Sequence, residues 1–219
     1  MGLTFGKPNK MTKESKVLTT DLLYLPPLAY FVAINGASEV HVYADAVLNR
    51  QSYANKAEVL LANKRETLTV PVHGLRKRLA IKNVKIDYHQ KWLNVHLRGI
   101  KSAYGKSPFF EYFYDDLEQI YLRKPEFLID LNLELLTLCL KFLRWNVSLV
   151  VKEKVGNRSQ ENDLRGLIHP KSLIDKGKIY KPSPYVQIFG ADFVPNLSIV
   201  DLLFCEGPAA NEVLNLSRK

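Results

Sequence analysis

The chain has 219 residues, of which 47% are hydrophobic, and its formal net charge at pH 7 is +9. This composition excludes a globally disordered chain and is sufficient for one α/β domain with a full core. No apolar run approaches the roughly 18 to 20 residues of a membrane span, and the polar N-terminus lacks the apolar region of a secretory signal.

The first predicted segment is a basic tail over residues 1–16. Four lysines and one glutamate give it a charge of +3, and the last two residues of the chain add +2, which leaves +4 for the remainder. We expect the tail to be disordered and dispensable, because it is polar and has no periodic apolar pattern. The charge excess therefore does not by itself indicate a nucleic-acid partner.

A strand, a helix and a second strand are predicted next. Residues 17–25 form an apolar β run, which Pro26 and Pro27 end because neither can donate to a ladder. Helical spacing follows Pro27 as far as Gly36, and residues 39–47 alternate as a strand. This order predicts a parallel sheet.

The next predictions are β structure and one basic cluster. Residues 57–62 and 66–72 resemble the arms of a hairpin across 63–65, and residues 84–90 form another predicted strand. Between them lies Arg76–Lys77–Arg78, which has no interleaved aromatic residues for stacking on bases. We interpret this cluster as a solvated loop, and we predict no nucleic-acid partner; an anionic small molecule fits it better than a duplex.

The middle third is predicted to be helical. Residues 91–107 form an amphipathic helix, Ser107–Pro108 cap and open a second helix to residue 124, and Pro125 opens a third. Leucines recur on several faces of the third helix, which predicts that Leu135 and Leu138 are buried.

The C-terminal third is predicted to contain a strand, a loop and a helix. Residues 147–153 form the strand, and the aperiodic residues 154–166 are typical of a mobile loop. The helix is expected to begin at Asn196 or Ser198, with Asp201 in its first turn, and to stop at Gly207–Pro208. The predicted fold is one α/β domain over residues 17–219, with an open, mainly parallel or mixed sheet, helices packed on it and a helix-rich middle third.

Motifs for phosphate, metal or nucleophilic chemistry do not occur in the sequence. It contains no Gly-rich phosphate loop, no Cys or His pair at zinc spacing and no nucleophile elbow. No metal site is predicted, and the motifs identify no cofactor. Cys139 and Cys205 are far apart, which favours reduced, packed thiols and a cytoplasmic protein.

Two stretches, "YLPPLAYFVAINGASEVHVYADAV" and "SYANKAEVLLANKRETLTVPV", resemble the N-terminal signature of the WbqC-like protein family. The central "WLNVHLRGIKSAYGKSPFFEYF" and the C-terminal "PNLSIVDLLFCEGPAA" are similar too, so the resemblance covers most of residues 17–210. The residues that carry the N-terminal part are Tyr24, Leu25, Pro26, Tyr30, Phe31, Asp45, Tyr53, Asn55, Lys56 and residues 68–72.

The resemblance implies a protein of surface-polysaccharide (O-antigen) biosynthesis that transfers an amino-acyl group such as glycine onto a sugar. Its substrate would be small and anionic or sugar-linked. Two alternatives stay open: a non-catalytic binding or scaffolding protein of the same pathway, and a nucleotidyltransferase-like protein. The chain also departs from the family pattern, because Asp21 and Leu22 stand where many members carry Gln-Pro.

The candidate site follows from the expected sheet, because ligands of open α/β sheets lie beyond the carboxyl ends of the strands. Tyr24 and Asp45 would end two neighbouring strands, and we predict that they share one cleft with Lys56 and His96. Asp45 and His96 are the predicted proton-transfer residues. The predicted substrate-binding residues are Tyr24, Tyr53, Asn55, Lys56, Trp92 and Arg98. The alternative is a packed corner in which these aromatic residues are structural.

Overall fold

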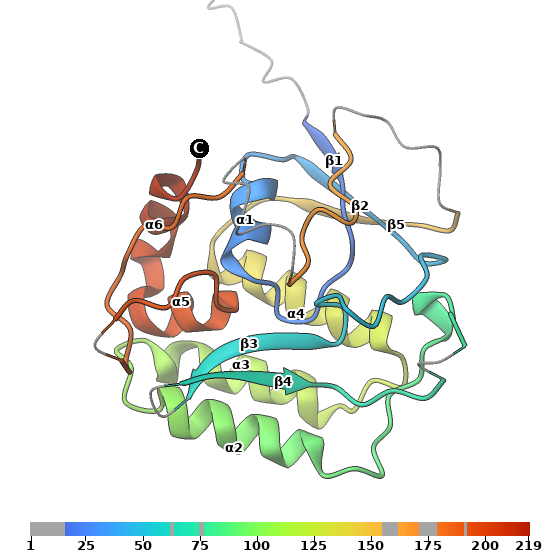
Figure 1. Cartoon of the computed structure of the whole chain (residues 1–219), viewed down its shortest axis with the longest axis horizontal. Helices are drawn as coiled ribbons and strands as arrows, with labels where there is room; N and C mark the ends of the chain where they lie inside the picture. Colours follow the sequence, from blue (N-terminus) through green and yellow to red (C-terminus); the bar gives the residue numbers. More distant parts are fainter. Residues whose placement is uncertain (1–15, 62–63, 75–76, 155–161, 171–178, 191) are drawn as a thin grey trace, which may run out of the picture.

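The computed structural model describes residues 16–61, 64–74, 77–154, 162–170, 179–190 and 192–219 (Figure 1). The predicted tail, apart from Lys16, and Arg76 of the basic cluster lie outside these ranges. Lys16 itself receives hydrogen bonds at its carbonyl from the Ser38 backbone N–H at 2.9 Å and from the Ser38 hydroxyl at 3.1 Å.

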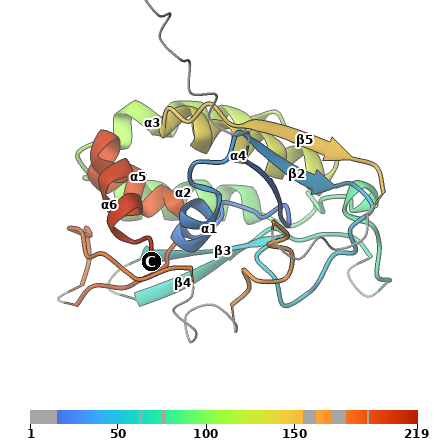
Figure 2. The ribbon, with the colours of Figure 1, turned by 90° about the horizontal axis from the view of Figure 1, so that it is seen from above.

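A three-stranded parallel sheet forms the part of the fold that positions the candidate site. Its strands are β1 (Val17–Thr19), β2 (Glu39–Tyr43) and β5 (Ser148–Lys152), in the order β1-β2-β5. Helix α1 (Leu28–Ile34) connects β1 to β2, and Figure 2 shows β2 and β5 side by side. The predicted open sheet with packed helices, and the strand–helix–strand order that begins it, are confirmed.

The first strand is much shorter than predicted. β1 ends at Thr19, and the chain then turns into the core, where Leu25 adopts a φ of 38°. A left-handed residue cannot continue a strand, so the prediction of a strand over residues 17–25 is wrong. Tyr24 and the two prolines consequently do not lie at a strand end.

The predicted hairpin forms a separate, antiparallel sheet. Its strands are β3 (Lys56–Leu61) and β4 (Lys64–Thr69), paired from Lys56↔Thr69 to Leu61↔Lys64. The prediction of a strand over residues 84–90 is wrong: a 3₁₀ turn, η1 (Ile81–Asn83), precedes a segment that makes isolated bridges from Ile86 to Val72 and from Lys85 to Phe127.

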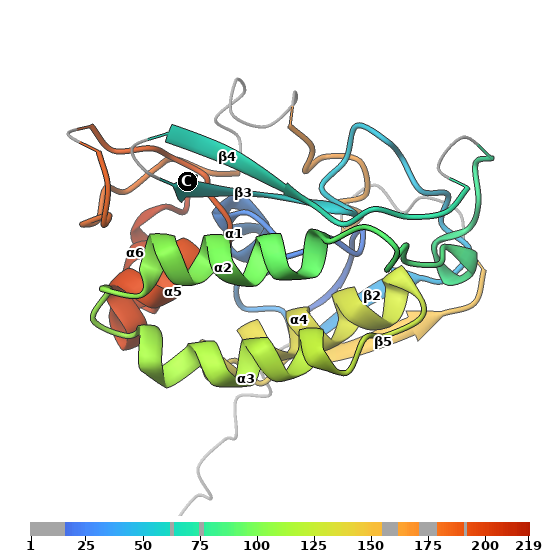
Figure 3. The ribbon, with the colours of Figure 1, turned by 90° about the horizontal axis from the view of Figure 1, so that it is seen from below.

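Three helices fill the middle of the chain, as predicted. They are α2 (Trp92–Tyr104), α3 (Phe110–Leu122) and α4 (Leu128–Phe142), and α3 packs against both of the others (Figure 3). Ser107 does not cap α3, because its hydroxyl donates to the Tyr104 carbonyl at 2.6 Å. α4 supplies much of the core: Leu135 is completely buried and Leu138 is 8% exposed, which confirms the prediction of their burial.

The C-terminal segment contains one helix more than predicted. α5 (Ile199–Glu206) ends before the 3₁₀ turn η2 (Gly207–Ala209), and α6 (Ala210–Leu216) follows at once. α5 therefore begins after Ser198 and ends at Gly207–Pro208, as predicted, and α6 is an additional helix. Gly207 adopts a φ of 51°, which a glycine tolerates without strain.

Candidate functional site

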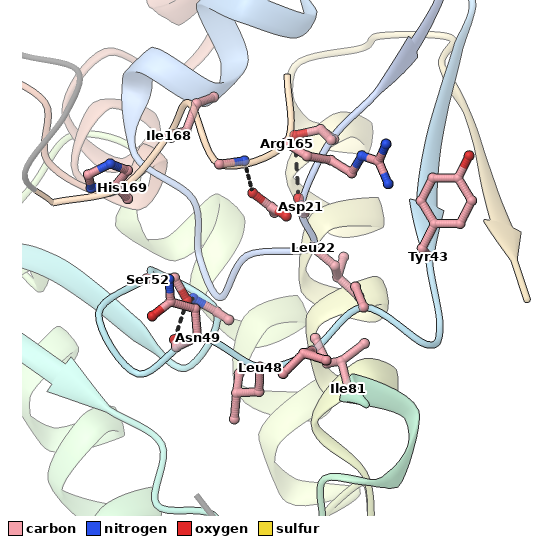
Figure 4. Close-up of a pocket in the computed structure, with 15 residues that line it drawn as sticks. Asp21, Leu22, Tyr43, Leu48, Asn49, Ser52, Ile81, Arg165, Ile168 and His169 are labelled. Atoms are coloured by element: carbon pink, nitrogen blue, oxygen red, sulfur yellow. Dashed lines mark hydrogen bonds between the residues drawn. The ribbon is translucent and has the colours of Figure 1, made fainter. Parts of the chain in front are cut away.

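A cavity of about 490 Å³ opens at the carboxyl ends of β1 and β2 (Figure 4). We call it the strand-end cavity; its polar and charged lining residues are Thr20, Asp21, Tyr43, Asn49, Ser52, Arg165 and His169. Its volume is in the range of small-molecule sites, and its place agrees with the rule for open parallel sheets. The cavity therefore borders the strand ends at which the sequence led us to expect a ligand.

The first wall of the cavity comes from the residues that follow β1. Thr20 is still tied to the sheet, since its backbone N–H donates to the His41 carbonyl at 3.0 Å. Asp21 comes next, and one of its carboxylate oxygens accepts the Gly166 backbone N–H at 2.6 Å. Leu22 then turns into the core with 5% of its surface exposed. A short strand end thus places one carboxylate at the rim of the cavity and anchors it on both sides.

The second wall is a segment over residues 162–170, which the sequence analysis assigned in part to a mobile loop. Its described residues continue the sheet beyond β1. The Thr19 N–H donates to the Asn162 carbonyl at 2.9 Å, and the Leu164 N–H donates to the Thr19 carbonyl at 2.7 Å. Ile168 is 2% exposed and anchors the segment in the core. Residues 162–166 form no helix or strand, which agrees with the predicted loop, and an isolated bridge between Thr19 and Asp163 ties them to β1; residues 155–161 lie outside the described ranges.

Arg165 is held in this wall by a carboxylate and an aromatic ring. Its Nε and Nη2 atoms donate to the two oxygens of Asp163 at 2.9 and 2.6 Å. The guanidinium carbon lies 5.0 Å from the centre of the Tyr43 ring, at the carboxyl end of β2. Hydrogen bonding to Asp163 raises the pKa of the Arg165 guanidinium above its ordinary value. The cavity is therefore lined by a fixed positive charge beside two carboxylates.

The floor of the cavity is a polar turn after β2. The Ser52 hydroxyl donates to the Asn49 carbonyl at 2.7 Å, and the Asn49 side chain accepts the Gln51 backbone N–H at 2.9 Å. In Figure 4 this turn lies below His169 and Asp21. A carboxylate, an amide, a hydroxyl and an imidazole in one cavity can donate to and accept from the hydroxyl groups of a ligand. Within the described residues, three or more His, Cys, Asp or Glu side chains do not gather in a way that could hold a metal ion.

The structure brings together two of the four residues predicted to share a cleft. The Tyr24 hydroxyl lies 2.9 Å from His96 Nδ1 and is also hydrogen-bonded to the Tyr121 hydroxyl. These three side chains are at most 2% exposed, so their hydrogen bonds lie in the core. The Thr69 backbone makes a further hydrogen bond to His96. This arrangement agrees with the alternative interpretation of Tyr24 as part of a packed corner.

The burial of His96 has a measurable consequence. Desolvation lowers its pKa from the ordinary 6.5 to about 4, although the hydrogen bond with Thr69 favours the charged form. An unfolded chain takes up a proton at the ordinary pKa, whereas the folded protein keeps this imidazole neutral down to about pH 4. We expect the free energy of unfolding to fall as the pH drops from 6.5 to 4, by about 3 kcal/mol from this group.

Urea denaturation at several pH values, repeated with His96→Gln, measures this dependence. The substitution should remove the part of the pH dependence between pH 6.5 and 4. Parallel profiles for the variant and the unmodified protein would show that His96 is not kept neutral by its surroundings.

Asp45 and Lys56, the other two residues of the predicted cleft, lie elsewhere. Asp45 is half-buried in the turn after β2, and the Lys56 ammonium donates to the Arg50 carbonyl at 3.2 Å. Among the described residues, the lining of the strand-end cavity includes neither of them, nor Tyr24 or His96. Their assignment to catalysis and binding stays a prediction.

The remaining predicted binding residues are mostly structural in their contacts. Tyr53 accepts the Tyr24 backbone N–H at its carbonyl at 2.9 Å, and burial raises the pKa of its phenol to about 12. Asn55 is buried, and its side-chain amide donates to the Val70 carbonyl at 2.9 Å. Trp92 is 6% exposed and packs edge-on against His96, whereas Arg98 lies exposed on α2.

The residues that line the cavity were not among the site residues predicted from the sequence. Asp21 carried one signal, because it departs from the pattern of the resembling family. Tyr43 closes the alternating strand, and its position at a strand end was available from the same rule that favoured Asp45. Arg165 and His169 carried no signal, since their segment has no periodicity that could reveal pairing with β1.

Comparisons with known proteins agree with the resemblance found in the sequence. A family model described as the WbqC-like protein family matches residues 23–174. The Uncharacterized protein Rv1507c of Mycobacterium tuberculosis is 24% identical over 240 aligned positions, which cover 93% of this chain and 99% of that protein. No solved structure matches the chain. A search of the described helices finds none that is both long and apolar enough to span a membrane.

Proposed function

The chain belongs to the WbqC-like protein family, and from this premise we propose that it binds a small sugar-linked molecule in the strand-end cavity and transfers an amino-acyl group to it. The observation that supports the proposal is the polar lining at the carboxyl ends of the parallel strands. The second wall and the floor lie inside the matched residues 23–174, whereas the first wall, formed by Thr20, Asp21 and Leu22, precedes them.

The lining suits a sugar better than an isolated anion. Arg165 already shares its charge with Asp163, so little of it remains for a phosphate group. Asp21, Asn49, Ser52 and His169 can each exchange hydrogen bonds with hydroxyl groups. The apolar part of the lining, which includes Leu22 and Ile81, can cover the C–H face of a sugar ring.

Transfer of an amino-acyl group requires little covalent participation by the protein. A sugar hydroxyl oxygen attacks the carbonyl carbon of an activated amino-acyl ester or thioester; a new C–O bond forms, and the bond to the leaving group breaks. The hydroxyl proton passes to a base and then to the leaving group. For this role the cavity offers the imidazole of His169, which can accept a proton and return it, whereas the sequence candidates Asp45 and His96 lie outside the lining.

One observation favours a second function, a non-catalytic binding protein. The charged groups of the cavity are engaged within the protein, Arg165 with Asp163 and Asp21 with the Gly166 backbone N–H. Groups held in this way can orient a ligand without taking part in chemistry. Under this alternative the same sugar-linked molecule binds, and no product forms.

A thermal-shift screen against nucleotide sugars, with and without amino-acyl donors, tests the proposal. A ligand present at 100 times its dissociation constant stabilises the folded protein by about 2.7 kcal/mol. The Asp21→Asn variant should need a roughly tenfold higher ligand concentration for the same thermal shift, because charge-assisted hydrogen bonds to the ligand hydroxyls are lost. Asp130→Asn is the matched control, since Asp130 lies exposed on α4.

Mass spectrometry of the same mixtures separates the two functions. An amino-acylated sugar product indicates a transferase, and a thermal shift without product indicates a binding protein. If Asp21→Asn and Asp130→Asn changed the ligand-induced thermal shift by the same amount, the assignment of the ligand to the strand-end cavity would be contradicted.

A further inference from the structure

A second surface feature lies apart from the strand-end cavity, between β4 and α2. We call it the β4–α2 groove; it encloses about 630 Å³. The residues of its lining that matter here are Lys64, Thr67, Leu68, Lys91 and Val95. α2 packs against β3, and Figure 3 shows the hairpin lying over α2. The groove shares no lining residue with the strand-end cavity within the described chain.

The hydrogen-bond pattern of the hairpin shows which backbone groups face away from β3. The Val70 N–H donates to the Asn55 carbonyl at 2.9 Å, so these two residues form a hydrogen-bonded pair in the register of the hairpin. Hydrogen-bonded and non-bonded pairs alternate along an antiparallel ladder. The backbone groups of Arg65, Thr67 and Thr69 therefore point outward from β4.

The two outer edges of the hairpin differ in whether their outward backbone groups have hydrogen-bond partners. On β3, the Glu58 carbonyl accepts the Ser198 N–H at 2.7 Å, and the Leu60 N–H donates to the Tyr104 hydroxyl at 3.2 Å. On β4, the Thr69 backbone is hydrogen-bonded to His96. Within the described residues, the structure shows no partner for the outward backbone groups of Arg65 and Thr67. An edge of this kind can pair with another strand.

The groove beside this edge is apolar and open. Leu68 forms part of its floor, and Val95 on α2 leaves 61% of its surface exposed at its rim. Gly99 on α2 has no side chain that could occupy the groove. A Cβ atom at this position would lie 3.7 Å from the Leu61 side chain, in van der Waals contact. Alternate side chains of an added strand could therefore enter the groove and cover Val95.

The charges around the groove are mainly positive. α2 contains no acidic residue, and Lys91, Arg98 and Lys101 lie exposed on or beside it. Lys64 on β4 is 74% exposed and forms a 3.3 Å ion pair with Glu66, the acidic member of the lining. The surplus of positive charge favours an acidic partner.

We propose that the outer edge of β4 binds an extended, acidic segment of a partner protein as an additional strand. The backbone of this segment pairs with Arg65 and Thr67, its apolar side chains enter the β4–α2 groove, and its net negative charge complements the lysine and arginine side chains around the groove. This is recognition by strand addition, in which the main chain provides affinity and the pockets provide specificity. A second copy of β4 fits less well, because its Lys64 and Arg65 would add positive charge to surroundings that are already mainly positive.

Fluorescence anisotropy with labelled peptides tests this proposal. The probe is an eight-residue peptide of alternating aspartate and valine, and the comparison peptide has lysine in place of aspartate. We expect saturable, salt-sensitive binding of the acidic peptide and at least roughly tenfold weaker binding of the basic one. Thr67→Pro removes an outward N–H and should abolish binding, whereas Thr67→Ala, which keeps the N–H, should preserve it.

A charge variant keeps the test decisive if Thr67→Pro fails to fold. Lys64→Glu combined with Lys91→Glu should lower the affinity for the acidic peptide by roughly tenfold or more. Lys152→Glu on β5 is the control and should change this affinity little. Equal binding of both peptides, no saturable binding, or insensitivity to the charge variant would overturn the proposal. If the protein self-associated and Thr67→Pro removed this self-association, the edge would bind a second copy of the chain, and the proposal of an acidic partner would also be overturned.

Discussion

Replacing Asp201 by alanine is expected to lower the free energy of unfolding by roughly 3 to 5 kcal/mol. Asp201 is completely buried in the first turn of α5. Its carboxylate accepts hydrogen bonds from the Tyr104 hydroxyl at 2.8 Å, from Gln187 Nε2 at 3.2 Å and from the Tyr185 hydroxyl. Alanine would leave the buried Tyr104 hydroxyl and the half-buried Tyr185 hydroxyl without this acceptor, and each such group costs about 1 to 3 kcal/mol.

The network of Asp201 also joins distant parts of the chain. Tyr104 belongs to α2 and accepts the Leu60 N–H of β3, while Gln187 donates to the Val194 carbonyl at 2.9 Å. Urea denaturation followed by circular dichroism measures the loss of stability. Asp201→Asn keeps the shape and one acceptor oxygen and should cost less than alanine, and the exposed Asp130→Ala should change stability by less than about 0.5 kcal/mol. A loss below about 1 kcal/mol for Asp201→Ala would show that the buried carboxylate does not hold these segments.

The second large effect is expected at Leu135. This side chain is completely buried on α4, which packs against α3, α5 and η1. Leu135→Ala is expected to cost roughly 2 to 5 kcal/mol, the sum of the lost transfer free energy and the cavity that remains. Chemical denaturation measures the change, and Leu122→Ala on α3, where the side chain is 51% exposed, is the control with a small effect. A loss below about 0.5 kcal/mol for Leu135→Ala would place α4 on the surface.

The helices could be predicted from the sequence because their burial is periodic and local. The spacing of leucines on α4 indicated its buried faces, and Gly36, with a φ of 81°, ends α1 as predicted. The strands were harder to predict. Residues 84–90 have the composition of a strand, but they make isolated bridges to two different segments, and the choice of partner is a long-range property.

The candidate site could be predicted in position but not in its residues. The rule for parallel sheets led to the carboxyl ends of β1 and β2, where the cavity lies. The length of β1 decided which residues reach it, and Leu25 turns the chain inward by a conformation that composition does not reveal. Arg165 and His169 arrive from a segment more than 120 residues after β2, through backbone pairing with Thr19.

The burial of His96 could have been found by the same reasoning that found the helices. Trp92, His96 and Ile100 follow one another at intervals of four on α2, and all three are buried. Two apolar neighbours at this spacing indicate that the histidine between them faces the core. Its hydrogen bond with Tyr24, which lies 72 residues earlier, could not be found in this way.

The binding of a sugar-linked molecule at the strand ends is tested most directly by mapping a bound nucleotide sugar on the protein by NMR. Titration into the ¹⁵N-labelled protein should shift the backbone amide signals around Asp21, Asn49, Ser52 and Gly166, and Asp21→Asn should weaken the apparent affinity. The signals of α2 and β4 should remain in place, because the β4–α2 groove lies apart from the cavity. Shifts confined to α2 and β4, or no shifts with any nucleotide sugar that stabilises the protein, would contradict the proposed function.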